Sequence, residues 1–376
     1  MRVVQVSFFR DPQRRPPETL LREWPALADV ARAVAAAGLE VHVVQAAADT
    51  AAIPRDGVTF HFVAERAAWW TARRSWLTLP STALRRRIVT LAPNVLHVHS
   101  LSFPLALRAA ARDVACPVLV QDHADAVPGK PVRWLSAAAL RRCAGVVFTA
   151  REQADPWRAA GCLPADLPVF EVPESSSHFT PGDRETARRA AGVFGDPAVA
   201  WVGRLAPVKD PLTAVEAFAD AVPDLPDSQL WCCFTDAPLF DRVAGLVRSD
   251  PRLTGRVHLL GRLPHEAVET LLRACDVYLA ASRREGSGFA VLEALACGLP
   301  AIVTDIPSFR RLTGDGAVGS LVPPGDARAM GRALVEWYGR PRRQERDAVR
   351  AHFERRLSFT AVGAGLRAAC EQVTAR

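Results

Sequence analysis

No stretch of this 376-residue chain is apolar over the length that a membrane span needs. A helix that crosses a bilayer requires about 20 consecutive apolar residues. With 49% hydrophobic residues, the composition therefore predicts a soluble globular protein with sizeable cores. Residues 1–10 read as a strand rather than as a charged segment followed by an apolar one, so we also expect no signal peptide.

Cysteine is present without the spacings that metal sites and disulfide frameworks use. None of the eight cysteines forms a Cys-x-x-Cys pair, and most stand among apolar residues. Zinc sites and disulfide-rich domains are recognised by such spacings. We therefore interpret the eight cysteines as reduced core thiols of a cytoplasmic protein.

Lysine is almost absent, since Lys130 and Lys209 are the only lysines among 47 basic residues. A lysine ammonium is a compact point charge that suits a phosphate group, so a lysine kept in such a chain is a candidate phosphate contact. The net charge is +7, and residues 1–172 carry nearly all of the excess. That bias is compatible with an anionic acceptor, a membrane surface or nucleic acid.

Short β-branched runs alternate with segments rich in Ala, Arg and Leu, which is typical of a parallel sheet covered by helices. In the first half we expect strands near 2–8, 40–45, 58–63, 95–98, 117–121, 144–149 and 168–172. Helices are expected at 18–37, 104–114, 135–142 and 151–160. The polar, turn-rich residues 173–183 predict a linker, after which a second domain begins.

Histidines and acidic residues follow two of the predicted strands of the first half. His97 and His99 close one strand, and Asp122 and His123 follow the next. Because ligands of parallel α/β sheets bind beyond the carboxyl ends of the strands, these side chains are candidates for a site. A structural role inside the domain is the alternative for each histidine.

The stretch 283–304 predicts a loop, a helix from about Phe289 to Cys297, and a strand. Ser287 or Gly288 is expected to cap the helix, whose first amides and dipole would bind a phosphate. Glu285 and Glu293 flank this site, and carboxylates accept hydrogen bonds from paired sugar hydroxyls. On spacing alone, solvated charges at a helix end explain both glutamates equally well.

The same stretch resembles the signature of family 4 of the retaining glycosyltransferases, which have the architecture called GT-B. The resemblance lies in Glu285-Gly-Ser-Gly-Phe and in Glu293-Ala-Leu-Ala-Cys-Gly-Leu-Pro. It implies an α/β fold of two Rossmann-like domains that face each other across a cleft. The implied parts are an acceptor-binding domain at 1–172, a linker at 173–183, a donor-binding domain at 184–357 and a helix at 358–376 that returns to the first domain.

The resemblance also implies roles for the residues around the phosphate site. Glu285 would be a catalytic residue against the donor sugar, and Glu293 would hold the ribose hydroxyls. The amides of Gly288, Phe289 and Ala290 would bind the diphosphate. The other contacts to the donor sugar would come from Gly286, Ser287 and Gly288.

Three further positions match the family outside that stretch. Arg204 and Lys209 lie in Gly-Arg-Leu-x-x-x-Lys, directly after a predicted strand, and would neutralise the departing diphosphate. The loop at Gly261 and Arg262 would receive the nucleobase. His123 would be a second catalytic residue close to the donor sugar.

The implied activity is transfer of a sugar from a nucleoside-diphosphate sugar, with UDP as the preferred nucleotide, to a hydroxyl acceptor. The resemblance implies no cofactor and no metal, and Asp122 and Asp125 lie three apart rather than two as in a metal-binding Asp-x-Asp motif. The alternatives are a nucleotide-sugar epimerase on the same scaffold and a non-catalytic subunit that binds sugar nucleotides. The donor sugar, the acceptor and the oligomeric state stay open.

Three segments depart from the family pattern. Residues 10–18 lack the Gly-Gly that many members carry after the first strand, and residues 232–238 replace a Gly-rich turn. Glu174-Ser175-Ser176 stands in the linker where Asn-Gly is common. Acceptor choice and base preference are therefore the least predictable properties.

Tryptophans and arginines are interleaved between residues 67 and 87. This segment holds Trp69, Trp70, Trp76, Arg73, Arg74, Arg85, Arg86 and Arg87. Such a pattern is compatible with peripheral contact to an anionic membrane on its cytoplasmic side, and tryptophans that pack on the sheet are the alternative. We expect no nucleic-acid partner, because no other segment approaches a basic stripe with stacking aromatics.

Overall fold

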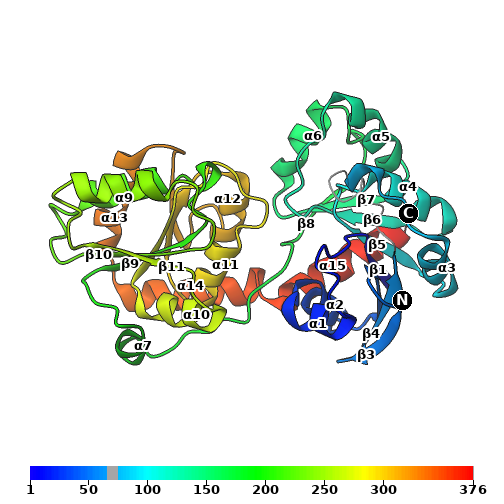
Figure 1. Cartoon of the computed structure of the whole chain (residues 1–376), viewed down its shortest axis with the longest axis horizontal. Helices are drawn as coiled ribbons and strands as arrows, with labels where there is room; N and C mark the ends of the chain where they lie inside the picture. The colour runs from blue at the N-terminus through cyan, green and yellow to red at the C-terminus, as the bar shows by residue number, and fades with distance from the viewer. Residues whose placement is uncertain (66–74, 376) are drawn as a thin grey trace. The chain divides into compact units, whose positions relative to one another are not determined.

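The computed structural model describes residues 1–65 and 75–375 and divides the chain into two compact units (Figure 1). Unit 1 comprises Met1–Ser175 together with the segment that begins at Phe359, and unit 2 comprises Ser176–Ser358. The crossing at Ser175–Ser176 falls inside the segment 173–183 that the sequence predicts as a linker. Among the described residues, no helix is both long and apolar enough to span a membrane.

Unit 1 is built on a sheet with the strand order β3-β4-β2-β1-β5-β6-β7-β8. The strands are β1 Arg2–Ser7, β2 Glu40–Ala47, β3 Ala51–Arg55, β4 Val58–Ala64, β5 Val95–His99, β6 Val118–Gln121, β7 Gly145–Phe148 and β8 Val169–Glu171. Neighbouring strands are parallel except for β3 and β4. The sequence analysis missed β3, which forms a hairpin through Asp56 and Gly57, both with positive φ as a tight hairpin turn requires.

Seven helices are described in unit 1. They are α1 Pro17–Glu23, α2 Ala26–Ala36, α3 Thr82–Thr90, α4 Pro104–Asp113, α5 Lys130–Leu140, α6 Asp155–Ala159 and α15 Phe359–Thr374. The prediction of one helix over 18–37 was wrong. The chain breaks at Trp24, which has φ −125° and ψ 65°, because a proline disfavours helical backbone in the residue before it.

The expected membrane-facing segment is only partly described. Residues 66–74, and with them Trp69, Trp70, Arg73 and Arg74, lie outside the described residues. The described remainder holds a 3-10 turn at Ser75–Leu77, with half-buried Trp76, and the helix α3. The sequence analysis did not predict α3 because only Leu84 and Ile88 of it reach the core. Arg85 pairs with Asp113, while Arg86 and Arg87 are exposed.

The helix α15 belongs to unit 1 although more than 180 residues separate it from Ser175 in the chain. It packs on α2 (Figure 1). The approach is close, because a Cβ added to Gly363 would lie 2.2 Å from the carbonyl oxygen of Ala33. Arg367 adds a hydrogen bond from Nη1 to the carbonyl oxygen of Ala37 at 2.7 Å.

Unit 2 is built on a parallel sheet with the order β11-β10-β9-β12-β13-β14. The strands are β9 Ala198–Gly203, β10 Gln229–Phe234, β11 Val257–Gly261, β12 Val277–Ala280, β13 Ala301–Thr304 and β14 Gly319–Val322. The helices are α7 Arg184–Ala191, α8 Pro211–Ala221, α9 Phe240–Ser249, α10 His265–Ala274, α11 Phe289–Ala296, α12 Pro307–Thr313, α13 Ala327–Tyr338 and α14 Arg342–Arg356. One hydrophobic core fills each face of this sheet.

The strand order places a crevice at a defined point of each sheet. In unit 2 the chain builds β10 and β11 on one side of β9 and then crosses to β12 on the other. The loops that follow β9 and β12 therefore diverge at the carboxyl edge, where ligands of such sheets bind. In unit 1 the corresponding point lies between β1 and β5.

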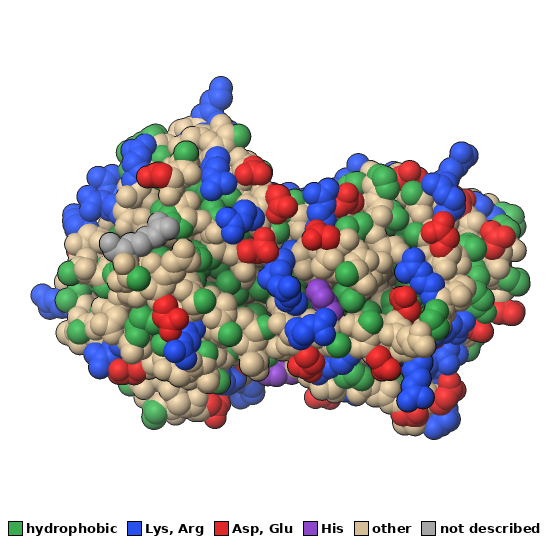
Figure 2. Space-filling view, turned by 180° about the vertical axis from the view of Figure 1, so that it is seen from behind, with side chains coloured by type: hydrophobic (Ala, Val, Ile, Leu, Met, Phe, Trp, Pro, Cys, Tyr) green, Lys and Arg blue, Asp and Glu red, His purple; other side chains and the backbone are tan. Residues whose placement is uncertain are grey.

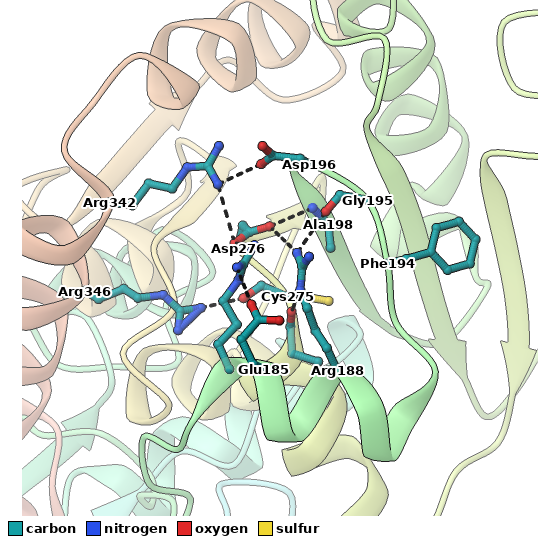
Figure 3. Close-up of polar contacts among 12 residues, drawn as sticks. Glu185, Arg188, Phe194, Gly195, Asp196, Ala198, Cys275, Asp276, Arg342 and Arg346 are labelled. Carbon is teal, nitrogen blue, oxygen red and sulfur yellow. Dashed lines mark hydrogen bonds and ion pairs between the residues drawn. The ribbon is translucent and has the colours of Figure 1, made fainter.

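A buried acidic residue ties helices to the opposite, amino-terminal edge of the unit 2 sheet (Figure 3). Asp276 directly precedes β12, and only 3% of its side chain is exposed. It accepts hydrogen bonds from the amide of Ala198 and from Arg188 Nη2, each at 2.8 Å. Arg184 contributes an ion pair at 2.7 Å and Arg342 a longer one at 3.9 Å, so α7 and α14 are both fastened to the starts of β9 and β12.

We predict that Asp276→Asn destabilises unit 2 by about 3 kcal/mol, because removing one partner of a buried ion pair leaves its cations uncompensated. Hydrogen exchange of the β9 and β12 amides measures the change within unit 2 alone. Asp305→Asn is the matched control, since Asp305 pairs with Arg310 at a more exposed position and should cost about 1 kcal/mol or less. Equal losses in the two variants would contradict this assignment.

Candidate functional site

Two loops at the carboxyl edge of unit 2 are joined by an ion pair. Lys209 follows β9 and Glu285 follows β12, and Nζ of Lys209 lies 2.5 Å from Oε1 of Glu285. The amide of Arg283 donates to the carbonyl oxygen of Val208 at 2.9 Å. Arg283 also pairs with Asp210 at 2.7 Å, so three contacts hold the loops together at the predicted crevice.

Glu285 is held by further contacts from its own surroundings. Ser282 donates a hydrogen bond from Oγ to Oε1 of Glu285 at 2.6 Å. Both residues line a small pocket together with Lys209, Gly288 and Tyr278. The carboxylate therefore has a defined orientation at the mouth of the crevice.

The helix α11 begins where the sequence predicts it, at Phe289. Gly288 is the N-cap with φ 67°, and a Cβ there would come within 3.0 Å of Leu312 and Phe309, so only glycine fits without strain. Of the two expected caps, Ser287 and Gly288, the structure has Gly288, so no side chain caps the helix, and Ser287 is buried. The first amides, at Phe289 and Ala290, have no carbonyl partner within the helix.

Glu293 lies one turn into α11 and faces a residue from another helix. Its Oε1 is 2.8 Å from Nε2 of His265, at the start of α10. Burial raises the pKa of the Glu293 carboxyl, and the hydrogen bond from His265 opposes the rise. His265 follows the predicted base-binding residues Gly261 and Arg262 by only a few positions, so the structure brings that loop and the predicted ribose-binding glutamate together.

Arg204 lies in the loop after β9 but outside the Lys209–Glu285 contact. Its side chain is exposed and forms no ion pair with another residue of the described ranges 1–65 and 75–375. Its charge is thus not neutralised by the protein, which leaves it available to an anionic ligand at this edge.

In unit 1, His123 lies at the carboxyl edge of the sheet between two partners. Its Nδ1 is 2.6 Å from Oε1 of Glu174, and its Nε2 is 2.9 Å from Nδ1 of His99. The rings of His97 and His99 are 4.5 Å apart, and burial lowers the pKa of His97 to about 3. Sequence reasoning missed Glu174 as a site residue, although its departure from the usual linker was a signal.

The turn that carries His123 is constrained on both sides. Asp122 accepts from the amides of Ala124 and Asp125 at 3.2 and 3.0 Å, and Ala124 has the unusual φ of 58°. Burial, helped by the charge of Asp125, raises the pKa of the Asp122 carboxyl to about 7. Strained backbone and a shifted pKa at one turn are typical of functional sites.

A cavity of about 350 Å³ opens at the end of β1 in unit 1. Phe8, Phe9 and Phe103 line it together with Arg10 and Arg14. Its two carboxylates are already neutralised by arginines, since Asp11 pairs with Arg15 and Glu65 pairs with Arg10, each at 2.8 Å. The loop 10–18, which lacks the family's Gly-Gly, therefore forms one wall of a mostly apolar cavity.

Comparison with known proteins relates the chain to one enzyme family. The family model described as "Glycosyl transferases group 1" matches residues 183–351, and "Glycosyltransferase Family 4" matches residues 26–170. The 2-deoxystreptamine N-acetyl-D-glucosaminyltransferase of Streptomyces fradiae is 31% identical over 282 residues, which cover 69% of this chain and 66% of that protein. The chain belongs to glycosyltransferase family 4. The resemblance noted in the sequence is thereby confirmed.

Other relatives of this glycosyltransferase have names that state different substrates. The D-inositol 3-phosphate glycosyltransferase of Geodermatophilus obscurus is 33% identical over 221 residues, which cover 53% of this chain and 46% of that protein. The matched regions thus span two thirds or less of these curated relatives' lengths.

Solved structures confirm the predicted GT-B fold of this glycosyltransferase. Sucrose-phosphate synthase from Thermosynechococcus elongatus has a TM-score of 0.71 at 18% identity and covers 100% of this chain and 99% of its own. An Anabaena protein crystallised with UDP and glucose has a TM-score of 0.66 at 16% identity and covers 99% of both chains. At these identities the likeness establishes the fold alone.

The sequence analysis expects neither a nucleic-acid partner nor a metal, and the described residues show how charged and metal-binding side chains are distributed. On the face shown in Figure 2, basic and acidic side chains are interspersed, whereas a nucleic-acid site needs a basic stripe. In the part of the chain that the structure describes, no three His, Cys, Asp or Glu side chains are grouped so as to hold a metal ion. Both absences stay predictions.

We predict that Glu293→Gln raises the melting temperature at pH 7. Because burial raises the pKa of this carboxyl above 4.5, ionisation costs more in the folded chain, and stability is lost as the pH rises from 4.5 through the raised pKa. The gain in the variant should therefore fade as the pH falls toward 4.5. Melting curves of both proteins between pH 4.5 and 7 test this, and a gain that does not depend on pH would contradict it.

Proposed function

We propose that this glycosyltransferase moves a sugar from a nucleoside-diphosphate sugar, with UDP as the preferred nucleotide, to a hydroxyl acceptor and retains the anomeric configuration. The observation that carries the proposal is the joining of Lys209 to Glu285 beside the start of α11. A cation, a carboxylate and unpaired helix amides at one edge of a parallel sheet suit a diphosphate with a sugar attached.

The diphosphate would lie at the start of α11. The amides of Gly288, Phe289 and Ala290 would donate to it, and Lys209 and Arg204 would supply positive charge without a metal ion. These groups would stabilise the negative charge that develops as the glycosidic bond to the phosphate breaks. Since Lys209 is already placed by Glu285, little reorganisation is needed at that moment.

The sugar and the nucleoside would extend to either side of the diphosphate. Glu285, with Gly286 and Ser287, would accept hydrogen bonds from the sugar hydroxyls, and Glu293 would accept them from the ribose. The contact of Glu293 with His265 supports this order, because His265 follows the loop at Gly261 and Arg262 that would receive the base.

Retention of the anomeric configuration without a protein nucleophile is consistent with the hydrogen bonds that Glu285 accepts. Its Oε1 already binds the ammonium of Lys209 and the hydroxyl of Ser282, which suits a hydrogen-bond acceptor better than a nucleophile. We infer a front-side displacement in which the leaving phosphate takes the proton of the acceptor hydroxyl. A covalent glycosyl-enzyme intermediate would overturn this part of the proposal.

The acceptor would enter the cavity at the end of β1. Because Asp11 and Glu65 are neutralised by arginines, the described lining offers no uncompensated carboxylate to an amino group. Three phenylalanines and Arg14 favour a neutral or anionic acceptor that carries an apolar face. We place the reaction in the cytoplasm, since all eight cysteines are free thiols, and the exposed Arg86 and Arg87 keep peripheral membrane contact within the proposal.

We predict that UDP raises the melting temperature of the chain more than GDP or ADP does. A ligand at 100 times its dissociation constant adds about 2.7 kcal/mol of stability. Lys209→Ala should abolish the shift, because it removes the cation beside the diphosphate. Thermal melts with each nucleotide measure both effects.

Lys130→Ala is the matched control for that experiment, since Lys130 is the other lysine of the chain and lies in unit 1. No shift with any nucleotide would contradict the donor site and favour a non-catalytic role. Conversion of a UDP-sugar to its epimer without an acceptor would instead identify an epimerase.

We predict that Phe9→Ala raises the KM for the acceptor about fivefold and leaves the stabilisation by UDP unchanged. Phe9 is 43% exposed and lines the cavity, and one aromatic contact is worth about 1 kcal/mol. Initial rates at varied acceptor concentration measure the effect. Phe194→Ala, at an exposed phenylalanine of unit 2, is the control, and an equal effect of both substitutions would contradict the assignment of the cavity.

A further inference from the structure

Both ring nitrogens of His123 are occupied inside unit 1. Oε1 of Glu174 lies 2.6 Å from Nδ1 of His123, and Nδ1 of His99 lies 2.9 Å from Nε2 of His123. The side chain of Glu174 is only 15% exposed, so its charge is less screened than on the surface and acts strongly on the ring. The three residues come from the crossing to unit 2, from the end of β5 and from the turn after β6.

The positions of the protons follow from the partners. A carboxylate only accepts hydrogen bonds, so Nδ1 of His123 carries a proton toward Glu174. One more proton lies between Nε2 of His123 and Nδ1 of His99. When both rings are neutral, this proton lies on Nδ1 of His99; when the pair is charged, it belongs to the ring that bears positive charge more easily.

Burial decides between the two rings. Burial, with the charges of neighbouring histidines, lowers the pKa of His99 well below 6.5. Burial also lowers the pKa of His123, but the hydrogen bond and charge of Glu174, helped by Asp125 and Asp122, outweigh it and leave the pKa raised. Glu174 therefore favours the imidazolium form of His123, in which Nε2 donates to neutral His99.

The other charged groups around the ring do not replace Glu174. Asp125 is engaged by the hydroxyls of Ser100 and Ser102 and by the amide of Leu101. Asp122 is engaged by backbone amides of its own turn. The titratable groups that face His123 are Glu174 from the crossing, His97 and His99 from β5, and Asp122 and Asp125 from the turn after β6.

We propose that Glu174 is a positioning residue, which fixes the orientation and the positive charge of His123 and so keeps the ring from acting as a proton acceptor. The inference rests on the proposed function and on the family resemblance, which implies a catalytic role for His123 close to the donor sugar. By the family resemblance, Glu174 lies in the linker where Asn-Gly is common. Glu174 lies two residues before the first residue of unit 2.

Glu174→Gln tests the proposal, because the amide keeps the size of the side chain and removes its charge. The titration of His123 is followed by NMR of protein labelled with ¹³C at histidine Cε1, with His123→Asn to assign the signal. We expect the His123 midpoint to move to lower pH in Glu174→Gln and to recover in Glu174→Asp. Glu171→Gln, the same change three residues earlier on β8, should leave the midpoint unchanged.

The rate of UDP release from UDP-glucose gives the second readout. In the wild-type chain this rate should fall only as the pH rises through the raised pKa of His123, whereas in Glu174→Gln the fall should begin at lower pH and leave about a tenfold loss at pH 8. Glu174→Asp should restore most of the rate. A merely structural role would lower the rate equally at every pH.

An unchanged His123 titration in Glu174→Gln would overturn the proposal, and so would a shifted titration with an unshifted rate profile. Failure of the proposed function has a different signature. It would show as the absence of UDP stabilisation in the wild-type chain, whatever the histidine titration does.

Discussion

The ion pair between Lys209 and Glu285 joins residues 76 positions apart and sets the geometry of the donor edge of unit 2. It forms because β9 and β12 are neighbours in the sheet, so that the loops after these strands leave the same edge side by side. Once the two side chains meet, the start of α11 lies beside a cation and a carboxylate. This ion pair is one of three contacts that hold the two loops together, and it is the one that joins two predicted site residues.

In unit 2, the amino edge of the sheet carries buried ion pairs that stabilise the fold, and the carboxyl edge carries the candidate site residues. At the amino edge, Asp276 is buried among arginines and fastens two helices to the strands. At the carboxyl edge, charged groups are half-buried, and Arg204 remains exposed. A rigid edge of this kind allows the opposite edge to keep unsatisfied helix amides and a costly buried carboxylate at Glu293, as functional sites commonly do.

Unit 1 keeps polar groups in its interior near its own carboxyl edge. The side chain of Gln5 and the Nε2 atoms of His97 and His99 are buried and make no hydrogen bond to another described residue. Such groups cost free energy in a protein interior. His99 carries this polarity to the carboxyl edge, where its other ring nitrogen contacts His123.

Local signals in the sequence determined much of what was predicted correctly. The helix start at Phe289 followed from glycines at 286 and 288, and the strands that alternate with helices followed from their β-branched runs. Each of these features depends on neighbours in the chain, and backbone preferences act at that range. The hairpin strand β3 and the break at Trp24 were missed although their signals are also local.

Only the tertiary structure decided which distant side chains meet. The contacts of Glu174 with His123 and of His265 with Glu293, and the packing of α15 on α2, join segments that have no common periodicity or motif. They arise from strand order and helix packing, which bring remote residues within hydrogen-bond distance. The sequence by itself therefore determined the family and the positions of the donor motifs, whereas the partners that set charge and orientation at each site depended on the folded chain, because those interactions exist only between residues that folding brings together.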